Sequence, residues 1–426
     1  MARIVVIGAG PMGLAAAHRA ATLGHEVDLV EAGREPGGMA AHLDFGGLSI
    51  ERFYHFVCKT DAPTFALMAE LGIADKMRWR ATSMGYFIGG RVHRWGDPVA
   101  LLRFPHLGLV AKLRTGLQMF RATRRRDFAS IEPLTARQWI ERGSGRRVYD
   151  TLWRRLMELK FYEFADEVSA SWVATRIRRV GRSRRSLFQE ELGYIEGGSE
   201  TLVRALVDAF AASGGRLHLG TPAQRVETAS GAVTGVTAGD RFFPAEAVLS
   251  TVPIPLVNRL APDLPPAWQA RYAAIRSVGV VCVLFKLRRS VTGHFWLNIA
   301  DPEIDIPGLV EFSRLRPLDA TIVYVPYYMP VTQPKWNWAD RQFVDEAFGY
   351  IRRVNPALGD DDLIEATVGR LRHAQPVCEP NFGDRLPPVQ TPIRGLQIAD
   401  TCFYYPEDRG IAESVRLGRL MAEAVA

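Results

Sequence analysis

The first forty residues alternate apolar runs with glycine turns in the order strand, helix, strand. Arg3 to Gly8 reads RIVVIG, a β-branched run of the kind that forms a buried parallel strand. The alanine-rich run from Leu14 to Leu23 has high helix propensity, and Gly24 follows it as a stop signal. Glu26 to Val30 is a second apolar run. The pattern predicts a βαβ unit whose first strand starts at residue 3, and we interpret that start as leaving no room for a signal peptide.

The turn between the first strand and the helix carries the candidate chemistry. It reads GAGPMG, in which Gly8 permits a tight turn, Gly10 lets the backbone approach a pyrophosphate, and Gly13 lets helix and strand pack closely. The N-terminus of the helix offers free N–H groups and a partial positive charge to phosphates. Glu31 follows the second strand, where a carboxylate accepts ribose hydroxyls and repels a 2′-phosphate. A glycine turn alone has a purely structural explanation, but this context predicts dinucleotide binding.

A second glycine-rich turn, EAGREPGGMA, follows directly from Glu31 to Ala40. A nicotinamide-binding domain would normally continue into another helix, whereas the pair Gly37-Gly38 fits a backbone that passes a longer cofactor. The run resembles the second fingerprint of the flavoprotein superfamily of amine oxidases, protoporphyrinogen oxidases, carotenoid desaturases and UDP-galactopyranose mutases. Met39 stands where many members have Arg, which is closer to the desaturase and mutase branches. The resemblance implies FAD as a non-covalent cofactor, with Cys402 and His55 as the candidates for a covalent link.

Later segments resemble cofactor-contacting parts of the same superfamily. Relatives hold the adenine at the position of Val226 and end a buried strand beside the cofactor as Ser250-Thr251 does here. Gly395 to Asp400 is similar to their final strand, although Ala399 replaces their usual Gly. The helix from Ile411 to Val425 would point its N-terminus at the flavin and stabilise its anionic reduced form. The predicted cofactor-binding residues are Gly8, Gly10, Pro11, Met12, Gly13, Glu31, Ala32, Gly37, Gly38, Met39, Val226, Thr251, Asp400, Asp408, Arg409, Gly410 and Ile411.

Two residues are candidates for catalysis. His55, in the run Tyr54-His55-Phe56, resembles a histidine that reaches the flavin ring in protoporphyrinogen-oxidase-like proteins, and the alternative is a packed, hydrogen-bonded histidine. Lys286 lies in an apolar strand, and amine-oxidase relatives use a lysine to orient water near flavin N5. The alternative for Lys286 is a lysine at a strand end whose ammonium reaches solvent.

Residues 86 to 192 change in character. Tyr86 to Trp95 predicts a hairpin around Gly89-Gly90, and residues 101–126 predict helix that is both apolar and rich in arginine. The segment 176–185 is strongly basic. A helical cap with a solvated basic face is one explanation, and a docking surface for anionic membranes is the other. The resemblance favours docking, because relatives that act on lipophilic substrates dock on membranes through this part of the chain.

Residues 261 to 385 contain recurring short strands with many aromatic residues, which predicts an antiparallel or mixed sheet. Aromatic residues at alternating positions usually form core. A sheet face lined with them also suits a flat or apolar substrate.

Composition excludes several classes of protein. The chain has 426 residues, of which 47% are hydrophobic and 23% charged, so it is globular with two or three domains. The net charge of +7 comes without any nucleic-acid-binding motif, so we expect no nucleic-acid partner. The four cysteines form no CxxC pair, which indicates buried thiols in the cytoplasm rather than a metal site or disulfides. No apolar run is long enough to span a membrane.

These observations predict an α/β fold with a Rossmann-like FAD-binding domain of GR2 type and an inserted mixed α+β substrate domain. We assign 1–85, 193–260 and 386–426 to the FAD-binding domain, and 86–192 and 261–385 to the helical cap and sheet of the substrate domain. The predicted function is an FAD-dependent oxidoreductase that takes a hydride from a C–C or C–N bond of an apolar or lipid-linked substrate, with oxygen or another electron acceptor. The alternatives are a flavin-dependent sugar-nucleotide mutase, with Arg176 and Arg314 holding a diphosphate, and a non-catalytic prenyl carrier. We expect a cytoplasmic protein with peripheral membrane contact through 101–126 and 176–185.

Overall fold

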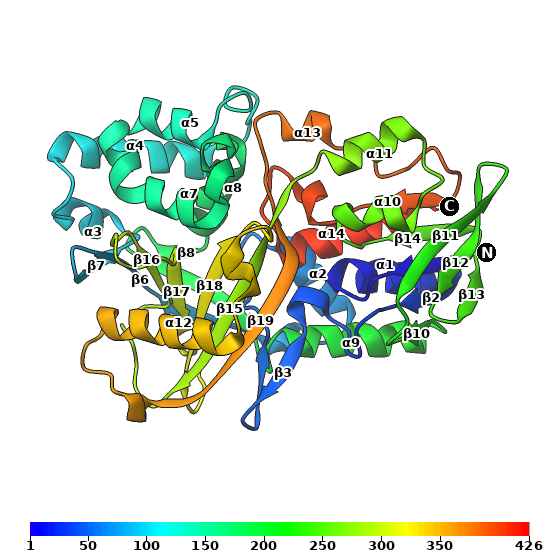
Figure 1. Ribbon diagram of the computed structural model, residues 1–426, viewed down its shortest axis with the longest axis horizontal. Coiled ribbons are helices and arrows are strands. Elements are labelled where there is room, and N and C mark those ends of the chain that lie inside the picture. Colours follow the sequence, from blue (N-terminus) through cyan, green and yellow to red (C-terminus); the bar gives the residue numbers. More distant parts are fainter. Residues whose placement is uncertain (426) are drawn as a thin grey trace.

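The computed structural model describes residues 1–425, and two large sheets lie next to each other in it (Figure 1). The first is a five-stranded parallel sheet in the order β10-β2-β1-β14-β20. Its strands come from distant parts of the chain: β1 (Arg3–Ile7), β2 (Glu26–Val30), β10 (Arg216–His218), β14 (Ala247–Ser250) and β20 (Leu396–Ile398). The order reverses at β1, which places the turn after β1 at a topological switch point, where α/β sheets bind ligands.

The two faces of this sheet are covered differently. Ile4 and Val6 of β1 pack with the helices α1 (Pro11–Thr22), α9 (Ser199–Ala212) and α14 (Ile411–Glu423). Val5 and Ile7, on the opposite face, share a core with the antiparallel sheet of β11 (Ala223–Ala229), β12 (Ala232–Ala238) and β13 (Arg241–Pro244). Because both faces are buried, β1 reads as a continuous apolar run.

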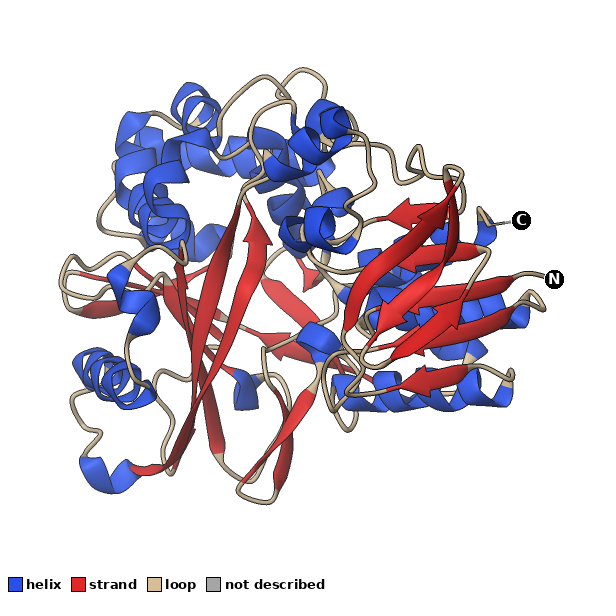
Figure 2. Ribbon diagram, turned by 45° about the vertical axis from the view of Figure 1, so that its right-hand side comes forward, coloured by secondary structure: helices blue, strands red, loops and turns tan. Residues whose placement is uncertain are grey.

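The second sheet has seven strands in the order β19-β15-β18-β17-β16-β6-β7. Neighbouring strands are antiparallel except for β16 and β6, so the sheet is mixed. The helix α12 (Asp340–Val354) packs on one face, as Figure 2 also shows. The strands are β6 (Met84–Ile88), β7 (Arg91–Trp95), β15 (Ser277–Leu287), β16 (Trp296–Ile299), β17 (Gly308–Glu311), β18 (Thr321–Met329) and β19 (Leu363–Pro376).

A group of helices lies at one end of the molecule beside the seven-stranded sheet (Figure 1). The helix α8 begins after Ser169, whose side chain accepts from the backbone N–H of Ser171, and α5 begins with a capping box of Thr135 and Gln138. A π-helical turn at Tyr149–Trp153 precedes α7. The helices of this cap are α3 (Pro98–Arg103), α4 (Leu109–Arg124), α5 (Ala136–Gly143), α6 (Arg146–Val148), α7 (Arg154–Phe161) and α8 (Ala170–Arg182).

Smaller elements join these units. The hairpin of β3 (His42–Phe45) and β4 (Leu48–Glu51) follows the second glycine turn, and β5 (Met77–Thr82), β9 (Gln189–Ile195) and β8 (Arg184–Ser186) form a three-stranded sheet. The remaining helices are α2 (Ala62–Glu70), α10 (Val257–Leu260), α11 (Pro266–Ala273) and α13 (Phe382–Arg385).

The fold class expected from the sequence is confirmed, and two of the expected domain boundaries fall inside strands. The boundary at 85/86 falls inside β6, and the boundary at 192/193 falls inside β9. The reason is that β9 pairs with β5 from Met77↔Ile195 to Thr82↔Glu190, so one antiparallel ladder bridges the two units. Among residues 1–425, no helix is long and apolar enough to cross a membrane.

Candidate functional site

The turn after β1 is held open by its glycines. Gly8 has φ +98, and a side chain at Gly13 would overlap the carbonyl oxygen of Gly8, so only glycine lets α1 start this close to β1. Pro11 opens α1, and Met12 comes second; the N-cap Gly10 has no side chain that could satisfy the first N–H groups. These N–H groups and the helix dipole therefore remain available to a phosphate.

Glu31 is fixed at the mouth of this turn. Its Oε2 accepts a hydrogen bond from the backbone N–H of Ala9 at 2.7 Å, and its Oε1 accepts one from that of Gly33 at 2.7 Å. Each carboxylate oxygen keeps a further lone pair, because a carboxylate can accept about four hydrogen bonds. Glu31 and the adjoining Ala32 thus present an oriented acceptor at the end of β2, as ribose binding requires.

The second glycine turn lies directly against the first. The backbone N–H of Gly37 donates to the carbonyl oxygen of Ala9 at 2.7 Å. A Cβ at Gly38, which has φ +53, would lie 3.1 Å from the Cα of Gly10. Met39 follows in a short 3-10 turn that ends at Ala40. The two glycine turns therefore line one continuous stretch of exposed backbone beside the N-terminus of α1.

Two other predicted cofactor residues belong to the surrounding core. Thr251 hydrogen-bonds through Oγ1 to the carbonyl oxygen of Ile7 at 2.9 Å, which closes the end of β1 next to Gly8. Val226 is fully buried in β11, where it pairs with Val236. The structure thus brings Thr251 to the glycine turn, while the side chain of Val226 packs into the core beneath the parallel sheet.

The segment before α14 forms the other wall of the site. Asp400 Oδ2 accepts from the N–H of Ile254 and Oδ1 from that of Cys402, both at 2.8 Å. Burial raises the pKa of Asp400, so these two bonds are what favour its charged form. The helix α14 starts at Ile411 after Gly410, again without a side-chain cap. A Cβ at Gly418 would overlap the carbonyl oxygen of Met12, so α14 packs closely on α1.

Asp408 and Arg409 connect this wall to the other two units. Asp408 forms an ion pair with Arg176 of α8. Arg409 donates to the hydroxyl of Tyr328 in β18 at 2.9 Å and to the carbonyl oxygen of Ala374 in β19. Burial acts to raise the pKa of Asp408, but the neighbouring cations, Arg176 first, outweigh it and hold that pKa below its ordinary value. The loop before α14 thus connects the unit built on the five-stranded parallel sheet, called here the dinucleotide unit, with the cap and the seven-stranded sheet.

His55 lies near this loop and is uncharged at neutral pH. Burial lowers its pKa to about 4, and Arg409 and Arg179 act in the same direction. The neighbouring Tyr54 packs edge-on against Trp296 and Tyr324, with ring centroids 5.6 Å apart in both pairs. His55 therefore contributes a neutral imidazole to the site and not a charged imidazolium.

Several buried polar atoms around these residues lack a hydrogen-bond partner. Within residues 1–425, His55 Nδ1, Gln375 Oε1 and Asp408 Oδ1 are buried and make no hydrogen bond. Gln375 follows Ala374, whose carbonyl oxygen accepts a hydrogen bond from Arg409, and Asp408 directly precedes Arg409, whose charge lowers the pKa of His55. Each buried unpaired polar atom costs about 1–3 kcal/mol. The cluster therefore fits a site whose missing hydrogen bonds come from a bound polar group, as an isoalloxazine ring would supply.

Lys286 lies toward the other end of β15 from Tyr328, so the structure does not bring it to the residues around Arg409. Its Nζ donates to the carbonyl oxygen of Gly46 at 3.0 Å, on the turn between β3 and β4. Along β15, Val280 pairs with Tyr328, and Lys286 lies six residues further on, which is about 20 Å at the rise of a strand. Arg314, expected to bind a diphosphate, pairs instead with Glu311 at 2.8 Å.

The structure adds residues that sequence reasoning missed. Lys160, Trp172 and Tyr328 lie next to Arg409 and Asp408, although they belong to α7, α8 and β18. Only one signal could have marked Lys160: the chain has few lysines, and this one stands in the apolar run around Phe161. All four cysteines are buried and free, and among residues 1–425 no group of three or more His, Cys, Asp or Glu could hold a metal ion.

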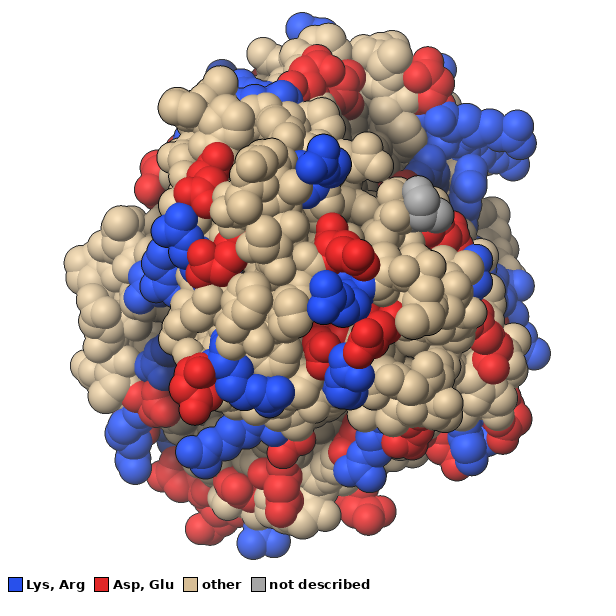
Figure 3. All heavy atoms as spheres, turned by 90° about the vertical axis from the view of Figure 1, so that its right-hand side faces the viewer, with Lys and Arg blue, Asp and Glu red and all other residues tan. Residues whose placement is uncertain are grey.

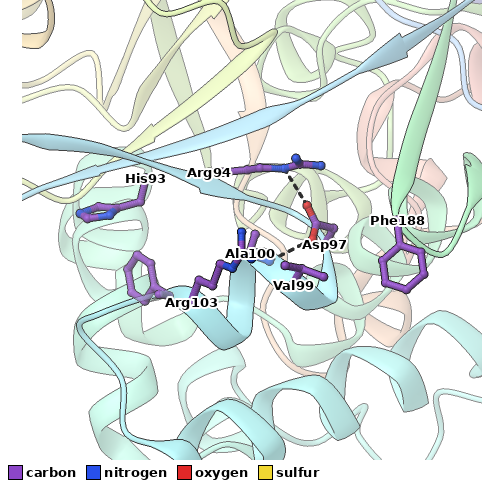
Figure 4. Close-up of a pocket in the computed structure, with 8 residues that line it drawn as sticks. His93, Arg94, Asp97, Val99, Ala100, Arg103 and Phe188 are labelled. Carbon is purple, nitrogen blue, oxygen red and sulfur yellow. Dashed lines mark hydrogen bonds and ion pairs between the residues drawn. The ribbon is translucent and has the colours of Figure 1, made fainter.

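A surface cavity of about 330 Å³ lies apart from these motifs, between β7 and α3 (Figure 4). Arg94 and Asp97 both line it, and Arg94 Nε donates a hydrogen bond to Asp97 Oδ2 at 2.9 Å. Its other lining residues are His93, Val99, Ala100, Arg103, Phe104 and Phe188. None of the residues predicted to bind the cofactor lines it.

Comparisons with known proteins agree with this geometry. The family model for flavin containing amine oxidoreductases matches residues 13–382, so the chain belongs to that family and its cofactor is a flavin. The 15-cis-phytoene desaturase of Narcissus pseudonarcissus is 25% identical over 282 residues, which are 61% of this chain and 49% of that protein. The chain thus spans about half the length of this curated relative.

Solved structures show the same fold at low sequence identity. A protein assigned as a protoporphyrinogen oxidase from Exiguobacterium sp. 255-15 superposes with a TM-score of 0.77 at 17% identity, covering 99% of this chain and 98% of that one. Reduced UDP-galactopyranose mutase superposes with a TM-score of 0.75 at 16% identity, covering 100% and 95%. These two likenesses concern the fold alone, since proteins of one fold carry out different reactions.

Proposed function

We propose that this member of the flavin containing amine oxidoreductase family is an FAD-dependent oxidoreductase that takes a hydride from a C–C or C–N bond. The observation that carries the proposal is the hydrogen bond of 2.7 Å between Gly37 N–H and Ala9 O. It places the second glycine turn alongside the first, which gives backbone contact for a cofactor longer than its pyrophosphate. The helix α14 packs on α1 at Gly418, and its N-terminus at Ile411 supplies a second uncapped helix end for that cofactor.

Each group of the chain has a defined part in this proposal. The first N–H groups of α1 bind the pyrophosphate, and Glu31 binds the ribose of the adenosine. Asp400 holds the loop before α14 through the N–H groups of Ile254 and Cys402, and that helix end stabilises negative charge on the ring. A bound flavin supplies the hydride acceptor, and the aromatic side chains around it keep water out.

The side chains opposite the glycine turns favour an apolar or lipid-linked substrate. Tyr54, Trp296 and Tyr324 form one edge-to-face cluster, and Trp172 and Tyr328 both face Lys160. Clustered aromatic side chains bind flat or apolar ligands by burying their apolar area.

We propose that the flavin is bound without a covalent link. Burial raises the pKa of the Cys402 thiol well above its ordinary value, and the nearby Asp400 carboxylate acts in the same direction. A thiol that stays protonated is a poor nucleophile toward the ring. His55, the other candidate, is a buried neutral imidazole with no charged partner to activate it.

The visible absorption spectrum of the purified protein, before and after heat precipitation, tests both statements. Flavin bands that remain in the supernatant, with FAD identified by mass spectrometry, are the expected result. Bands that stay with the precipitate would contradict non-covalent binding. A protein without flavin bands after incubation with FAD would contradict the enzyme proposal and favour the carrier alternative.

A mutase-type isomerase is the second candidate, favoured by the position of Arg176. Its guanidinium lies in the site, 4.8 Å from the Trp172 ring centroid, although it is paired with Asp408. A mutase works only after its flavin has been reduced, whereas an oxidoreductase starts from the oxidised flavin. Turnover of UDP-galactopyranose that requires prior dithionite treatment would therefore support the mutase and contradict the oxidoreductase.

We also propose that the protein docks peripherally on anionic membranes through α4. This helix exposes an apolar stripe, with Leu109 65%, Val110 71% and Leu113 60% exposed, and Leu117 and Phe120 continue the stripe. Basic residues lie beside it: Arg103, Lys112, Arg114, Arg121, Arg124, Arg125 and Arg126. An exposed apolar stripe flanked by basic residues suits the boundary of an anionic bilayer, such as the cytoplasmic leaflet.

The basic segment 176–185, also expected to contact the membrane, is mostly occupied elsewhere. Arg176, Arg178 and Arg179 of this segment form ion pairs with Asp408, Glu407 and Asp61. At the opposite end of the molecule, the face that carries both termini shows basic and acidic side chains interspersed (Figure 3). The proposed docking surface is therefore α4 with the neighbouring Arg103, Arg125 and Arg126.

Co-sedimentation with vesicles tests this docking. Vesicles of phosphatidylserine and phosphatidylcholine should bind the protein, and raising the salt to 0.5 M should weaken binding by screening the arginines. Leu113→Ser with Phe120→Ser should abolish it, because each removes an exposed apolar side chain. Phe242→Ser is the matched control, since Phe242 is 54% exposed on β13 of the dinucleotide unit. Equal loss in both variants would contradict docking through α4.

A further inference from the structure

Lys160 is a buried lysine without an anionic partner of its own. It lies in the last turn of α7 and is 7% exposed. Within residues 1–425 its Nζ makes no hydrogen bond and no ion pair. Burying an unpaired ammonium is costly, so a buried lysine is normally paired or else loses its proton.

Three aromatic rings surround the amine. The Nζ atom lies 4.9 Å from the ring centroid of Trp172, 5.0 Å from that of Tyr328 and 5.6 Å from that of Phe161. Two of these rings also face the charged groups of the site, because Arg176 packs on Trp172 and Arg409 on Tyr328. The amine therefore lies next to the residues that join the cap to the loop before α14, called here the cofactor loop.

The charges around Lys160 are mostly positive. Asp408 is the nearby carboxylate, but it already pairs with Arg176, and Arg409 adds a further cation. The Cys378 thiol after β19 also faces the amine and stays protonated, because burial raises its pKa. Burial first, then Arg176 and Arg409, lower the pKa of Lys160 well below that of an ordinary lysine, against a smaller opposite effect of Asp408. The surroundings of the amine thus favour its neutral form over the ammonium.

Lys335 shows what a purely structural lysine looks like in this protein. It too lies between two rings, 4.6 Å from the centroid of Tyr327 and 4.7 Å from that of Trp338. Its Nζ, however, is 2.5 Å from Oε2 of Glu346, which compensates its charge. The aromatic surroundings are common to both lysines, and the absence, among the described residues, of a carboxylate within ion-pair distance of Nζ is what distinguishes Lys160.

We propose that Lys160 faces the substrate and accepts the proton that the substrate loses during oxidation. The inference rests on the proposed hydride transfer to a flavin. When a C–C or C–N bond is oxidised, one C–H bond breaks and its electron pair leaves as hydride to the flavin. A proton leaves from the neighbouring carbon or nitrogen, and its bonding pair forms the double bond. The lone pair of Nζ takes that proton, and the three rings stabilise the resulting ammonium by cation–π contact.

Competitive labelling of the FAD-loaded protein with acetic anhydride, read by mass spectrometry, tests the state and access of the amine. The chain has only six lysines, Lys59, Lys76, Lys112, Lys160, Lys286 and Lys335, so each is followed separately. We expect Lys160 to react, with a midpoint below the value of about 10.4 of a free lysine side chain. A midpoint at that value, or no reaction in the folded protein with normal reaction after unfolding, would overturn the inference.

The flavin spectrum supplies a second readout that needs no substrate. We expect the visible bands of the wild-type protein to shift over the same pH range in which Lys160 titrates, because a charge appears beside the ring. Lys160→Met, which keeps the side-chain volume, should bind FAD and lose that shift, whereas Lys335→Met should retain it. A shift unchanged in Lys160→Met, or absent from the wild type, would overturn the inference. A protein that binds no FAD would instead overturn the proposed function, and the labelling result would still be read on its own.

Discussion

Replacing Gly13 by alanine should separate cofactor binding from folding. The added Cβ would overlap the Gly8 carbonyl oxygen and lie 3.1 Å from Thr251 Oγ1. Since carbon contacts are ordinary at about 3.5 Å, the start of α1 must shift by on the order of 1 Å. That shift misaligns the N–H groups that meet a phosphate, and a hydrogen bond to a charged group contributes about 1.5–3 kcal/mol. Losing one such bond weakens FAD binding by about 10- to 150-fold.

Titration of the apoprotein with FAD, followed by quenching of flavin fluorescence, measures this affinity. Thermal unfolding of the apoprotein reports the accompanying strain, which should be about 1–3 kcal/mol for an overpacked site. Gly349→Ala is the matched control, because Gly349 lies inside α12 with nothing within 4 Å of an added Cβ. This control should keep FAD affinity and gain up to about 1 kcal/mol of helix stability. Gly13→Ala with wild-type FAD affinity would refute the assignment of the α1 N-terminus as the phosphate site.

Three further variants and one surface control probe other charged and titratable groups. Glu31→Gln should weaken FAD binding by about tenfold in the same titration, because both carboxylate oxygens accept backbone N–H groups and an amide NH₂ would face one of these donors. Asp61→Asn should lower the free energy of unfolding in urea by about 1–3 kcal/mol, since the half-buried Arg179 loses its charged partner. The surface variant Asp345→Asn should change that energy by less than about 0.5 kcal/mol. For His55, the pKa of about 4 lies below the unfolded value, so the folded state binds fewer protons between pH 4 and 6.5 and its stability is complete above that window. Stability should therefore fall by up to about 3 kcal/mol as the pH drops through the window, and His55→Gln should fall less; an equal fall in both proteins would contradict the assignment.

The cofactor side of the site was predictable because its signals are local. The turn from Gly8 to Gly13, Glu31 and the pair Gly37-Gly38 lie within one short stretch, and each follows from backbone geometry that sequence spacing reveals. The long strand β19 (Leu363–Pro376) was not predictable in the same way. Its residues are mostly half-buried and include several charges, so it shows neither a continuous apolar run nor a clear alternation.

The substrate side was not predictable because it is assembled from distant segments. Lys160 lies in α7, Tyr328 in β18 and Arg409 in the loop before α14. Their spacing in the sequence does not predict that they are in contact. The position of Lys286 was not predictable for the same reason. Sequence places it in an apolar strand of the right kind, but which end of β15 faces the cofactor depends on the pairing with β18. Six residues along that strand carry the lysine about 20 Å from Tyr328.

One helix connects the proposed docking surface to the site. On one side, α8 packs against α4, where Arg182 Nε donates to the carbonyl oxygen of Thr123 at 2.9 Å and a Cβ at Gly181 would press on the Thr123 side chain. On the other side, Arg176 pairs with Asp408 in the loop before α14. Helices transmit force as rigid elements, whereas loops absorb it. If the protein docks through α4 as proposed, we expect the membrane also to restrict the loop before α14 and the surroundings of Lys160, because α8 contacts both.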